Sequence, residues 1–324
     1  MLSEFDLIRQ YFTRVNHDDA RIALSIGDDC ALINPTPGMQ LAISSDMLVE
    51  GRHFFAGADP FTLGHKCLAV NLSDLAAMGA KPFAFTLALA LPEANAAWLQ
   101  AFSRGLLSLA DQYACHLIGG DTTKGPLTIS ITIWGEVAPG HALRRDSAKV
   151  GDDIWVSGSL GDARLALASY LHEVQLTPAE LEIAATRMHQ PTPRISLGLV
   201  LVAENLAHAA LDISDGLAGD LGHILTQSQV GASLFLDRLP AGEMLQKQSL
   251  DLRRAFTLSG GDDYELCFTA PRAHREKILR AGAACATPVT RIGFIEAQLG
   301  LRLLDDQRSV VDFPVKSFDH FLSS

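Results

Sequence analysis

Residues 59–91, DPFTLGHKCLAVNLSDLAAMGAKPFAFTLALAL, have the pattern of a long helix followed by a strand. Asp59 suits a helix N-cap and Pro60 the first helical position, while Gly79 suits the end of that helix. The apolar run Phe83–Leu91 is typical of a buried strand. A helix that leads into a buried strand, within a chain where such segments alternate, predicts an α/β or α+β fold.

The alternation continues on both sides of this stretch. Leu41–Ser45 has the pattern of a strand, and Ile195–Ala209 has the periodicity of a helix. The chain has 324 residues, which is long for a single core. Pro139–Asp153 is rich in loop-forming residues and is the best candidate boundary. We therefore expect two domains, residues 1–138 and 139–324.

Composition excludes several classes of protein. The net charge of −11 disfavours nucleic acid as a partner, because that role needs a basic surface. The five cysteines form no CxxC motif, which argues against a disulfide framework or a zinc site and favours a reducing compartment. Met1–Asp6 lacks the pattern of a signal peptide, and the apolar runs are shorter than the roughly 20 residues that span a bilayer. We expect a soluble, cytoplasmic protein with no membrane partner.

Six short segments combine glycine or serine with aspartate. Mg²⁺ prefers oxygen ligands and usually binds a few carboxylates together with the phosphates of a substrate. Backbone N–H groups in glycine turns can bind phosphate oxygens as well. The segments are Gly27-Asp28-Asp29, Ser44-Ser45-Asp46, Asn71-Leu72-Ser73-Asp74, Gly119-Gly120-Asp121-Thr122-Thr123, Asp212-Ile213-Ser214-Asp215-Gly216 and Ser259-Gly260-Gly261-Asp262-Asp263.

Any one of these segments alone is more often an ordinary turn or helix cap. Asp74 is the exception, because it lies in an apolar helix where a carboxylate is unfavourable unless it is paired or bound to a metal. Asp215 opens a predicted helix, so we expect the N–H groups of the turn at Ser214–Gly216 to be available to an anion. As a group, the segments predict a magnesium-dependent enzyme that handles ATP through aspartates.

Other nucleotide and hydrolase motifs are missing from the sequence. There is no GxxxxGK[ST], so the chain is not a P-loop NTPase, and there is no HRD or DFG set and no GxSxG. Among the histidines, His53 is the one that we would consider for a ligand contact, because it lies near Ser45 and Asp46.

Taken in order, the acidic segments resemble those of the thiamine-monophosphate kinase family, in the superfamily of aminoimidazole-ribonucleotide synthetase and selenophosphate synthetase. The resemblance covers almost the whole chain. It implies transfer of the γ-phosphate of ATP to thiamine monophosphate, giving thiamine diphosphate and ADP, with several Mg²⁺ ions. It also implies a homodimer. Domain 1–138 would bind metal and ATP and join its copy in a barrel-like sheet, and the α/β domain 139–324 would cover the nucleotide.

The resemblance also implies three sets of site residues. The magnesium ligands would be Asp29, Ser44, Ser45, Asp46, Asp74, Asp121, Asp212 and Asp215. The ATP contacts would be Gly120, Asp121, Arg145 and Ser214. The contacts to thiamine monophosphate would be His53, Asp262 and Phe318, with Phe321 as an alternative to Phe318.

The implied reaction fits the absence of an obvious catalytic base or nucleophile. The second pKa of a phosphate monoester is near 6, so the acceptor oxygen is already anionic at neutral pH. Two unit charges 4 Å apart repel by about 4 kcal/mol at an effective dielectric constant near 20. We therefore expect Mg²⁺ to bring the two phosphates together for a direct in-line transfer.

Three alternatives stay open. Selenophosphate synthetase is disfavoured because no Cys-Gly-x-Lys-like segment lies near the N-terminus. Aminoimidazole-ribonucleotide synthetase is disfavoured because Ser259–Leu266 fits the kinase better. A non-catalytic binding or maturation scaffold is disfavoured because it would not need so many carboxylates.

Overall fold

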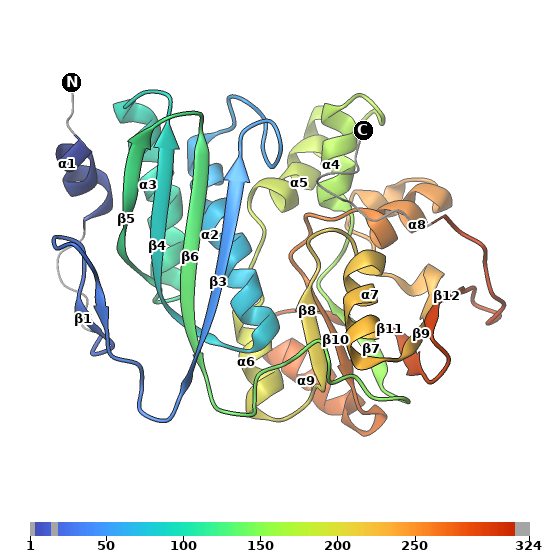
Figure 1. Ribbon diagram of the computed structural model, residues 1–324. Coiled ribbons are helices and arrows are strands. Elements are labelled where there is room, and N and C mark those ends of the chain that lie inside the picture. The colour runs from blue at the N-terminus through green and yellow to red at the C-terminus, as the bar shows by residue number, and fades with distance from the viewer. Residues whose placement is uncertain (1–3, 14–18, 315–324) are drawn as a thin grey trace. The chain divides into compact units, whose positions relative to one another are not determined.

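The computed structural model describes residues 4–13 and 19–314 (Figure 1). Helices and strands alternate along the chain, so the predicted α/β class is confirmed. The chain forms two compact units, which are described in turn. Unit 1 comprises Met1–Leu75 and Ala80–Gly140, and unit 2 comprises Ala76–Gly79 and His141–Ser324.

Unit 1 is built on a four-stranded sheet. Its order in space is β3 (Gln40–Val49), β6 (Thr128–Val137), β4 (Lys81–Leu91) and β5 (His116–Lys124). β6 is antiparallel to both of its neighbours, whereas β4 and β5 are parallel. The helices α2 (Pro60–Met78) and α3 (Ala96–Gln112) lie on the same face of the sheet (Figure 1). The helix and strand predicted within residues 59–91 are thus α2 and β4.

The core of unit 1 lies between this sheet and the two helices. Alternate residues of β6 are fully buried, namely Ile129, Ile131 and Ile133, and so is Phe85 on β4. Each such side chain contributes about 1.5–3 kcal/mol by leaving water. This core fixes β3 and α2, which carry several of the predicted magnesium ligands.

A small hairpin completes the described part of unit 1 beside the short helices α1 (Glu4–Leu7) and η1 (Ile8–Phe12, a π-helical turn). The hairpin pairs β1 (Ile22–Leu24) with β2 (Leu32–Ile33) in antiparallel fashion. It packs on the four-stranded sheet around Ala84. The turn between its strands carries Gly27-Asp28-Asp29.

Unit 2 is built on a six-stranded sheet. Neighbouring strands in this sheet are antiparallel, except for the pair β12 (Gly300–Leu304) and β9 (Gly231–Phe235), which are parallel. The order in space is β12 (Gly300–Leu304), β9 (Gly231–Phe235), β11 (Val289–Glu296), β7 (Asp153–Ser157), β10 (Leu266–Ala270) and β8 (Ala209–Asp212). The α-helices are α4 (Asp162–Tyr170), α5 (Pro178–His189), α6 (Ile195–Ala203), α7 (Leu217–Ser228), α8 (Leu250–Ser259) and α9 (Arg275–Ala284). Three single 3₁₀ turns are η2 (Leu236–Arg238), η3 (Leu245–Lys247) and η4 (Arg272–His274).

The prediction of one helix over Ile195–Ala209 is wrong at its end. α6 ends at Ala203, Asn205 adopts a left-handed conformation with φ of 50°, and β8 begins at Ala209. Apolar residues continue through both elements, so helical periodicity alone could not separate them.

Within the described residues the four-stranded sheet is open, with β3 and β5 at its edges. A barrel-like sheet made with a second copy therefore stays a prediction. No helix in the described part of the chain is long and apolar enough to cross a membrane.

Candidate active site

The first group of predicted ligands lies where β3 passes α2. Side chains alternate along a strand, so Ser44 and Asp46 point to one face of β3. On that face Ser44 Oγ donates a hydrogen bond to Asp74 Oδ2. Asn71, one helical turn before Asp74, accepts a hydrogen bond from the Asp46 N–H through Oδ1 at 3.3 Å. The fold thus brings Ser44, Asp46 and Asp74 together.

Asn71 has a positional role that the sequence did not reveal. The residue is fully buried, and its Nδ2 donates to the carbonyl of Cys67 at 2.9 Å. This second bond fixes the amide so that its oxygen faces β3. Asn71 therefore holds the backbone of β3 at Asp46.

The surroundings of Asp46 favour its protonated form. Burial, and then the charge of Asp74, raise the pKa of Asp46 from 3.8 to about 7. A raised pKa means that the ionised form of Asp46 is unfavourable in this setting. A cation bound beside Asp46 and Asp74 would stabilise the ionised carboxylates against both effects, so the donor set fits a hard divalent ion.

Ser45 lies apart from this group. Its hydroxyl contacts Thr132 Oγ1 at 2.9 Å and donates to the carbonyl of Ile131 at 3.2 Å, both on β6. Because neighbours on a strand point to opposite faces, Ser45 faces away from Ser44 and Asp46. Its role as a magnesium ligand stays a prediction.

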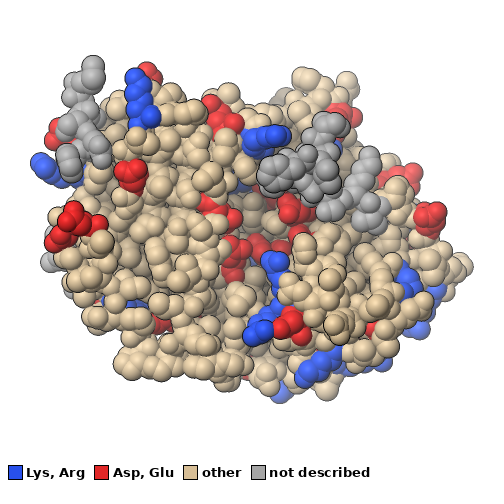
Figure 2. Space-filling view, viewed as in Figure 1, with Lys and Arg blue, Asp and Glu red and all other residues tan. Residues whose placement is uncertain are grey.

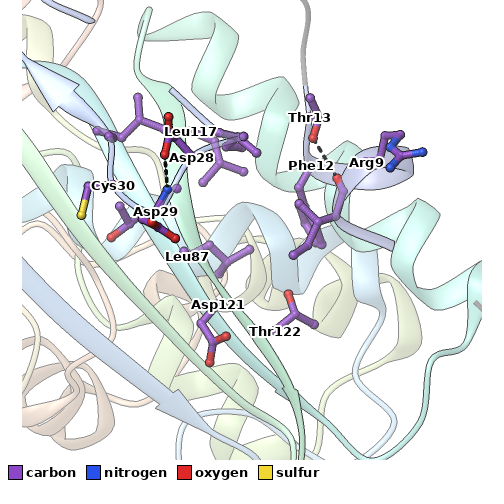
Figure 3. Close-up of a pocket in the computed structure, with 18 of the residues that line it drawn as sticks. Arg9, Phe12, Thr13, Asp28, Asp29, Cys30, Leu87, Leu117, Asp121 and Thr122 are labelled. Atoms are coloured by element: carbon purple, nitrogen blue, oxygen red, sulfur yellow. Dashed lines mark hydrogen bonds between the residues drawn. The ribbon is translucent and has the colours of Figure 1, made fainter. Parts of the chain in front are cut away.

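The second group lines a cavity of about 960 Å³ at the β5 side of the sheet (Figure 3). Asp29 comes from the β1–β2 turn, and Gly120 and Asp121 come from β5. Figure 3 shows Phe12 and Arg9 on η1 across the cavity from Asp29. The cavity therefore combines exposed carboxylates with apolar side chains.

The segment Gly119–Asp121 has the composition of a turn, but it lies within a strand. β5 continues through this segment to Lys124 and stays paired with β4. Gly120 has φ of 149°, and a Cβ there would lie 1.8 Å from the carbonyl oxygen of Leu87. The glycine lets two strands approach closely, and it leaves Asp121 exposed in the cavity.

Asp46 of the first group and Asp121 of the second lie on opposite edge strands of one sheet. β6 and β4 separate β3 from β5, so a spacing of about 4.8 Å between strands puts their backbones about 14 Å apart. In residues 4–13 and 19–314, no three His, Cys, Asp or Glu side chains converge as a ready metal site. The carboxylates predicted as ligands in unit 1 therefore form two pairs. One pair is Asp46 and Asp74, and the other is Asp29 and Asp121.

In unit 2, Asp212 ends β8 and is buried, and the loop after it carries Ser214 and Asp215. The expectation that the N–H groups of this loop are available to an anion is wrong. Those of Ser214, Asp215 and Gly216 all donate to Asp220 Oδ2, at 3.0, 3.1 and 3.1 Å. Asp220 lies in the first turn of α7. An acidic residue near the start of a predicted helix is the sequence feature that points to such a contact with the N–H groups before the helix.

The segment with Asp262 lies against this same loop. The Asp262 N–H donates to the Ser214 carbonyl at 2.7 Å. Asp262 and Tyr264 both have positive φ, 61° and 50°, a conformation that is uncommon for residues other than glycine. The structure thus brings Asp262 and Ser214 together.

Asp263 and Glu265, which follow Asp262, have a structural role. Glu265 is fully buried and accepts hydrogen bonds from Ser157, Arg187 and Arg194. Asp263 accepts the N–H of Gly161 at 2.8 Å. These two acids therefore hold β10 against the elements around it, a role that the sequence motif did not indicate.

The remaining predicted contacts lie elsewhere. His53 Nδ1 accepts the N–H of Val49 at 3.0 Å, which fixes the ring beside the end of β3. Arg145 is exposed, whereas its neighbour Arg144 forms a surface ion pair with Asp146. Phe318 and its alternative Phe321 lie outside the described residues.

Comparison with known proteins agrees with the motifs. The chain matches the models of AIR synthase related protein, N-terminal domain, over residues 27–137 and C-terminal domain over residues 149–306. It is 44% identical over 321 residues to thiamine-monophosphate kinase of Salmonella typhimurium (strain LT2), covering 98% of each chain.

Two solved structures have the same fold. Thiamine-monophosphate kinase from Stenotrophomonas maltophilia K279a has a TM-score of 0.84 and 48% identity, covering 88% of this chain and 92% of that chain. AaThiL complexed with AMPPCP and TMP has a TM-score of 0.75 and 29% identity, covering 88% and 89%. The resemblance seen in the sequence is thereby confirmed, and this chain belongs to the thiamine-monophosphate kinase family.

Proposed function

We propose that this chain is an ATP-dependent kinase that transfers the γ-phosphate of ATP to thiamine monophosphate, giving thiamine diphosphate and ADP. The observation that carries the proposal is 44% identity over 98% of the chain to a thiamine-monophosphate kinase. The 29% identical relative in complex with AMPPCP and TMP supports the same pair of substrates.

The chemistry of unit 1 supports a magnesium-dependent reaction. Asp46, Asp74 and Ser44 supply one set of oxygen donors, and Asp29 with Asp121 supplies another. When bound, Mg²⁺ would supply charge neutralisation between these carboxylates and the phosphates of both substrates. The chain's own residues then align the acceptor oxygen with the γ-phosphate for in-line displacement. No residue needs to remove a proton, because the acceptor oxygen is already ionised at neutral pH.

An assay of ADP release tests this function. With purified protein, ATP and Mg²⁺, ADP is expected to form when thiamine monophosphate is added, together with an equal amount of thiamine diphosphate. Formylglycinamidine ribonucleotide, the substrate type of the related synthetase, serves as the control acceptor. ADP release with that acceptor and none with thiamine monophosphate would overturn the proposal.

Asp121→Asn tests the carboxylate in the cavity. Asp121 is exposed, so the substitution is expected to leave the melting temperature unchanged while lowering kcat by about a hundredfold at saturating Mg²⁺. Glu93→Gln is a matched control, because Glu93 is another exposed carboxylate of unit 1 outside the predicted site. Near-normal turnover by Asp121→Asn would remove Asp121 from the metal site.

We further propose that residues 1–138 form the metal-binding, ATP-binding and dimerisation domain of a homodimer. The edge strand β3 supports this, because it exposes Leu41, Ile43 and Met47 by 36, 59 and 56%. In the view of Figure 2 the surface over the four-stranded sheet is largely uncharged. Exposed apolar residues on an unpaired edge strand favour pairing with another chain.

Ile43→Glu is expected to disrupt this dimer. A charge in the apolar face of β3 would be buried without a partner, so the dimer would dissociate while the monomer stays folded. Light scattering after gel filtration should give twice the chain mass of 34.8 kDa for the wild type and the single mass for Ile43→Glu. Leu279→Glu, at another exposed leucine in unit 2, is the control and should stay dimeric. A monomeric wild type would contradict the prediction.

A further inference from the structure

Asp220 is a buried acid with an unusual set of partners. Its side chain is 5% exposed, and its Oδ2 atom alone accepts the three consecutive N–H groups of residues 214–216. These groups precede α7, at the helix end where a negative charge is stabilised by the aligned peptide dipoles. The carboxylate therefore closes the loop back onto the helix that follows it.

The arrangement has an electrostatic penalty. Burial, and then the charge of Asp215, raise the pKa of Asp220 from 3.8 to about 6. Helix stability alone does not require this, since an N-cap serine or asparagine satisfies the same end of a helix without a buried charge. What Asp220 adds is a fixed backbone at three successive residues.

The other side of the loop is held as tightly. The N–H groups of Asp262 and Tyr264 donate to the carbonyls of Ser214 and Ile213, at 2.7 and 2.8 Å. A Cβ on Gly216 would meet the backbone of Ser259 at 3.0 Å, so the two segments are in direct contact. The three N–H groups of the loop and the carbonyl of Ser214 are thus already bonded within the protein.

We propose that Asp220 is a positioning residue, which fixes the loop at residues 214–216 so that Ser214 and Asp215 face the magnesium-bound nucleotide. This inference rests on the proposed function, because it takes Ser214 as a nucleotide contact and Asp215 as a metal ligand. Without the carboxylate, three N–H donors lose their acceptor, and the loop is held only by the bonds from Asp262 and Tyr264. The side chains of Ser214 and Asp215 would then have to be ordered at the moment of binding, which weakens the affinity for the nucleotide.

Asp162 provides a matched control within the same unit. It is also a buried acid at the start of a helix, and it accepts N–H groups of Met244 and Leu245 at 3.4 and 2.8 Å. The segment that it holds carries none of the predicted site residues. If buried acids of this kind matter only for folding, Asp162→Asn and Asp220→Asn should behave alike.

The test compares Asp220→Ala, Asp220→Asn and Asp162→Asn with the wild type. Calorimetry of Mg·AMPPCP binding is expected to show affinity weakened about tenfold or more in Asp220→Ala and less in Asp220→Asn, which keeps one oxygen acceptor. Asp162→Asn should lower the melting temperature without changing that affinity. In steady-state assays the KM for ATP should rise in the Asp220 variants, while the KM for thiamine monophosphate stays within about twofold.

Unchanged affinity for Mg·AMPPCP in a folded Asp220→Asn variant, or an equal loss in Asp162→Asn, would overturn the proposal. The binding measurement does not require phosphoryl transfer. A wild type that binds Mg·AMPPCP but does not phosphorylate thiamine monophosphate would therefore refute the proposed acceptor while still testing Asp220.

Discussion

Replacing Asp46 by asparagine is expected to lower phosphoryl transfer by about a thousandfold and, without divalent cations at pH 8, to make the protein more stable. Activity falls because the amide carries no charge with which to hold a cation against the phosphates. Stability rises because the substitution removes an ionised group that burial and Asp74 disfavour.

The pH dependence follows from the direction of the shift. The pKa of Asp46 is about 7 in the folded state and 3.8 ordinarily, so the folded state binds more protons between those values. The free energy of unfolding therefore falls as pH rises through this window. The shift of about 3 pH units sets an upper limit of about 4 kcal/mol at pH 8, since one unit equals about 1.36 kcal/mol. Below pH 4 the difference between wild type and Asp46→Asn should vanish.

Thermal melts from pH 4 to pH 8 in a chelating buffer would measure this effect. Asp46→Asn should melt a few degrees higher than the wild type at pH 8, with Glu93→Gln as the neutral control. Adding Mg²⁺ should stabilise the wild type more than the variant. A variant that is less stable at pH 8, or that keeps most of its activity, would be inconsistent with a cation site at Asp46.

Glu265→Gln is expected to destabilise the protein by about 3–5 kcal/mol. Glu265 is fully buried and binds Arg187 at 2.6 Å and Arg194 at 2.6 and 2.5 Å, so the amide would leave two guanidinium groups without their counter-charge. The amide also keeps only one oxygen acceptor, so some of the hydrogen bonds from Ser157, Arg187 and Arg194 are lost.

Urea unfolding would measure this loss. Glu173→Gln is a suitable control, because Glu173 pairs with Arg164 but is 46% exposed, and surface pairs contribute only about 0–1 kcal/mol. A similar free energy of unfolding for both variants would show that the buried pairs do not stabilise unit 2. Because Asp262 precedes Glu265 by three residues, substrate affinity should fall together with stability.

Prediction from the sequence was most accurate where a single local pattern determines a helix or a strand. The helix within residues 59–91 and the strand after it follow from an N-cap, a proline and a long apolar run, and all three are local features. Asp74 was also recognisable, because a carboxylate among buried leucines needs a partner, and Ser44 proved to be one of its contacts. The family followed from the order of the acidic segments.

The features that the sequence did not predict depend on partners far along the chain. Gly120 resembled a turn residue, but its positive φ serves a close approach to Leu87 on another strand. Asp220 resembled an ordinary helical acid, because nothing in the sequence shows that three N–H groups fold back onto it. Glu265 belonged to a recognised motif, yet its arginines are 78 and 71 residues away.

The most direct test of the proposed function follows the transferred phosphate itself. Protein, thiamine monophosphate and Mg²⁺ would be mixed with ATP labelled in its γ-phosphate, and the products separated and counted. We predict that the label appears in the terminal phosphate of thiamine diphosphate, one for each ADP formed, and that Asp46→Asn gives almost none. Label released only as inorganic phosphate, with thiamine monophosphate left unchanged, would contradict the proposal.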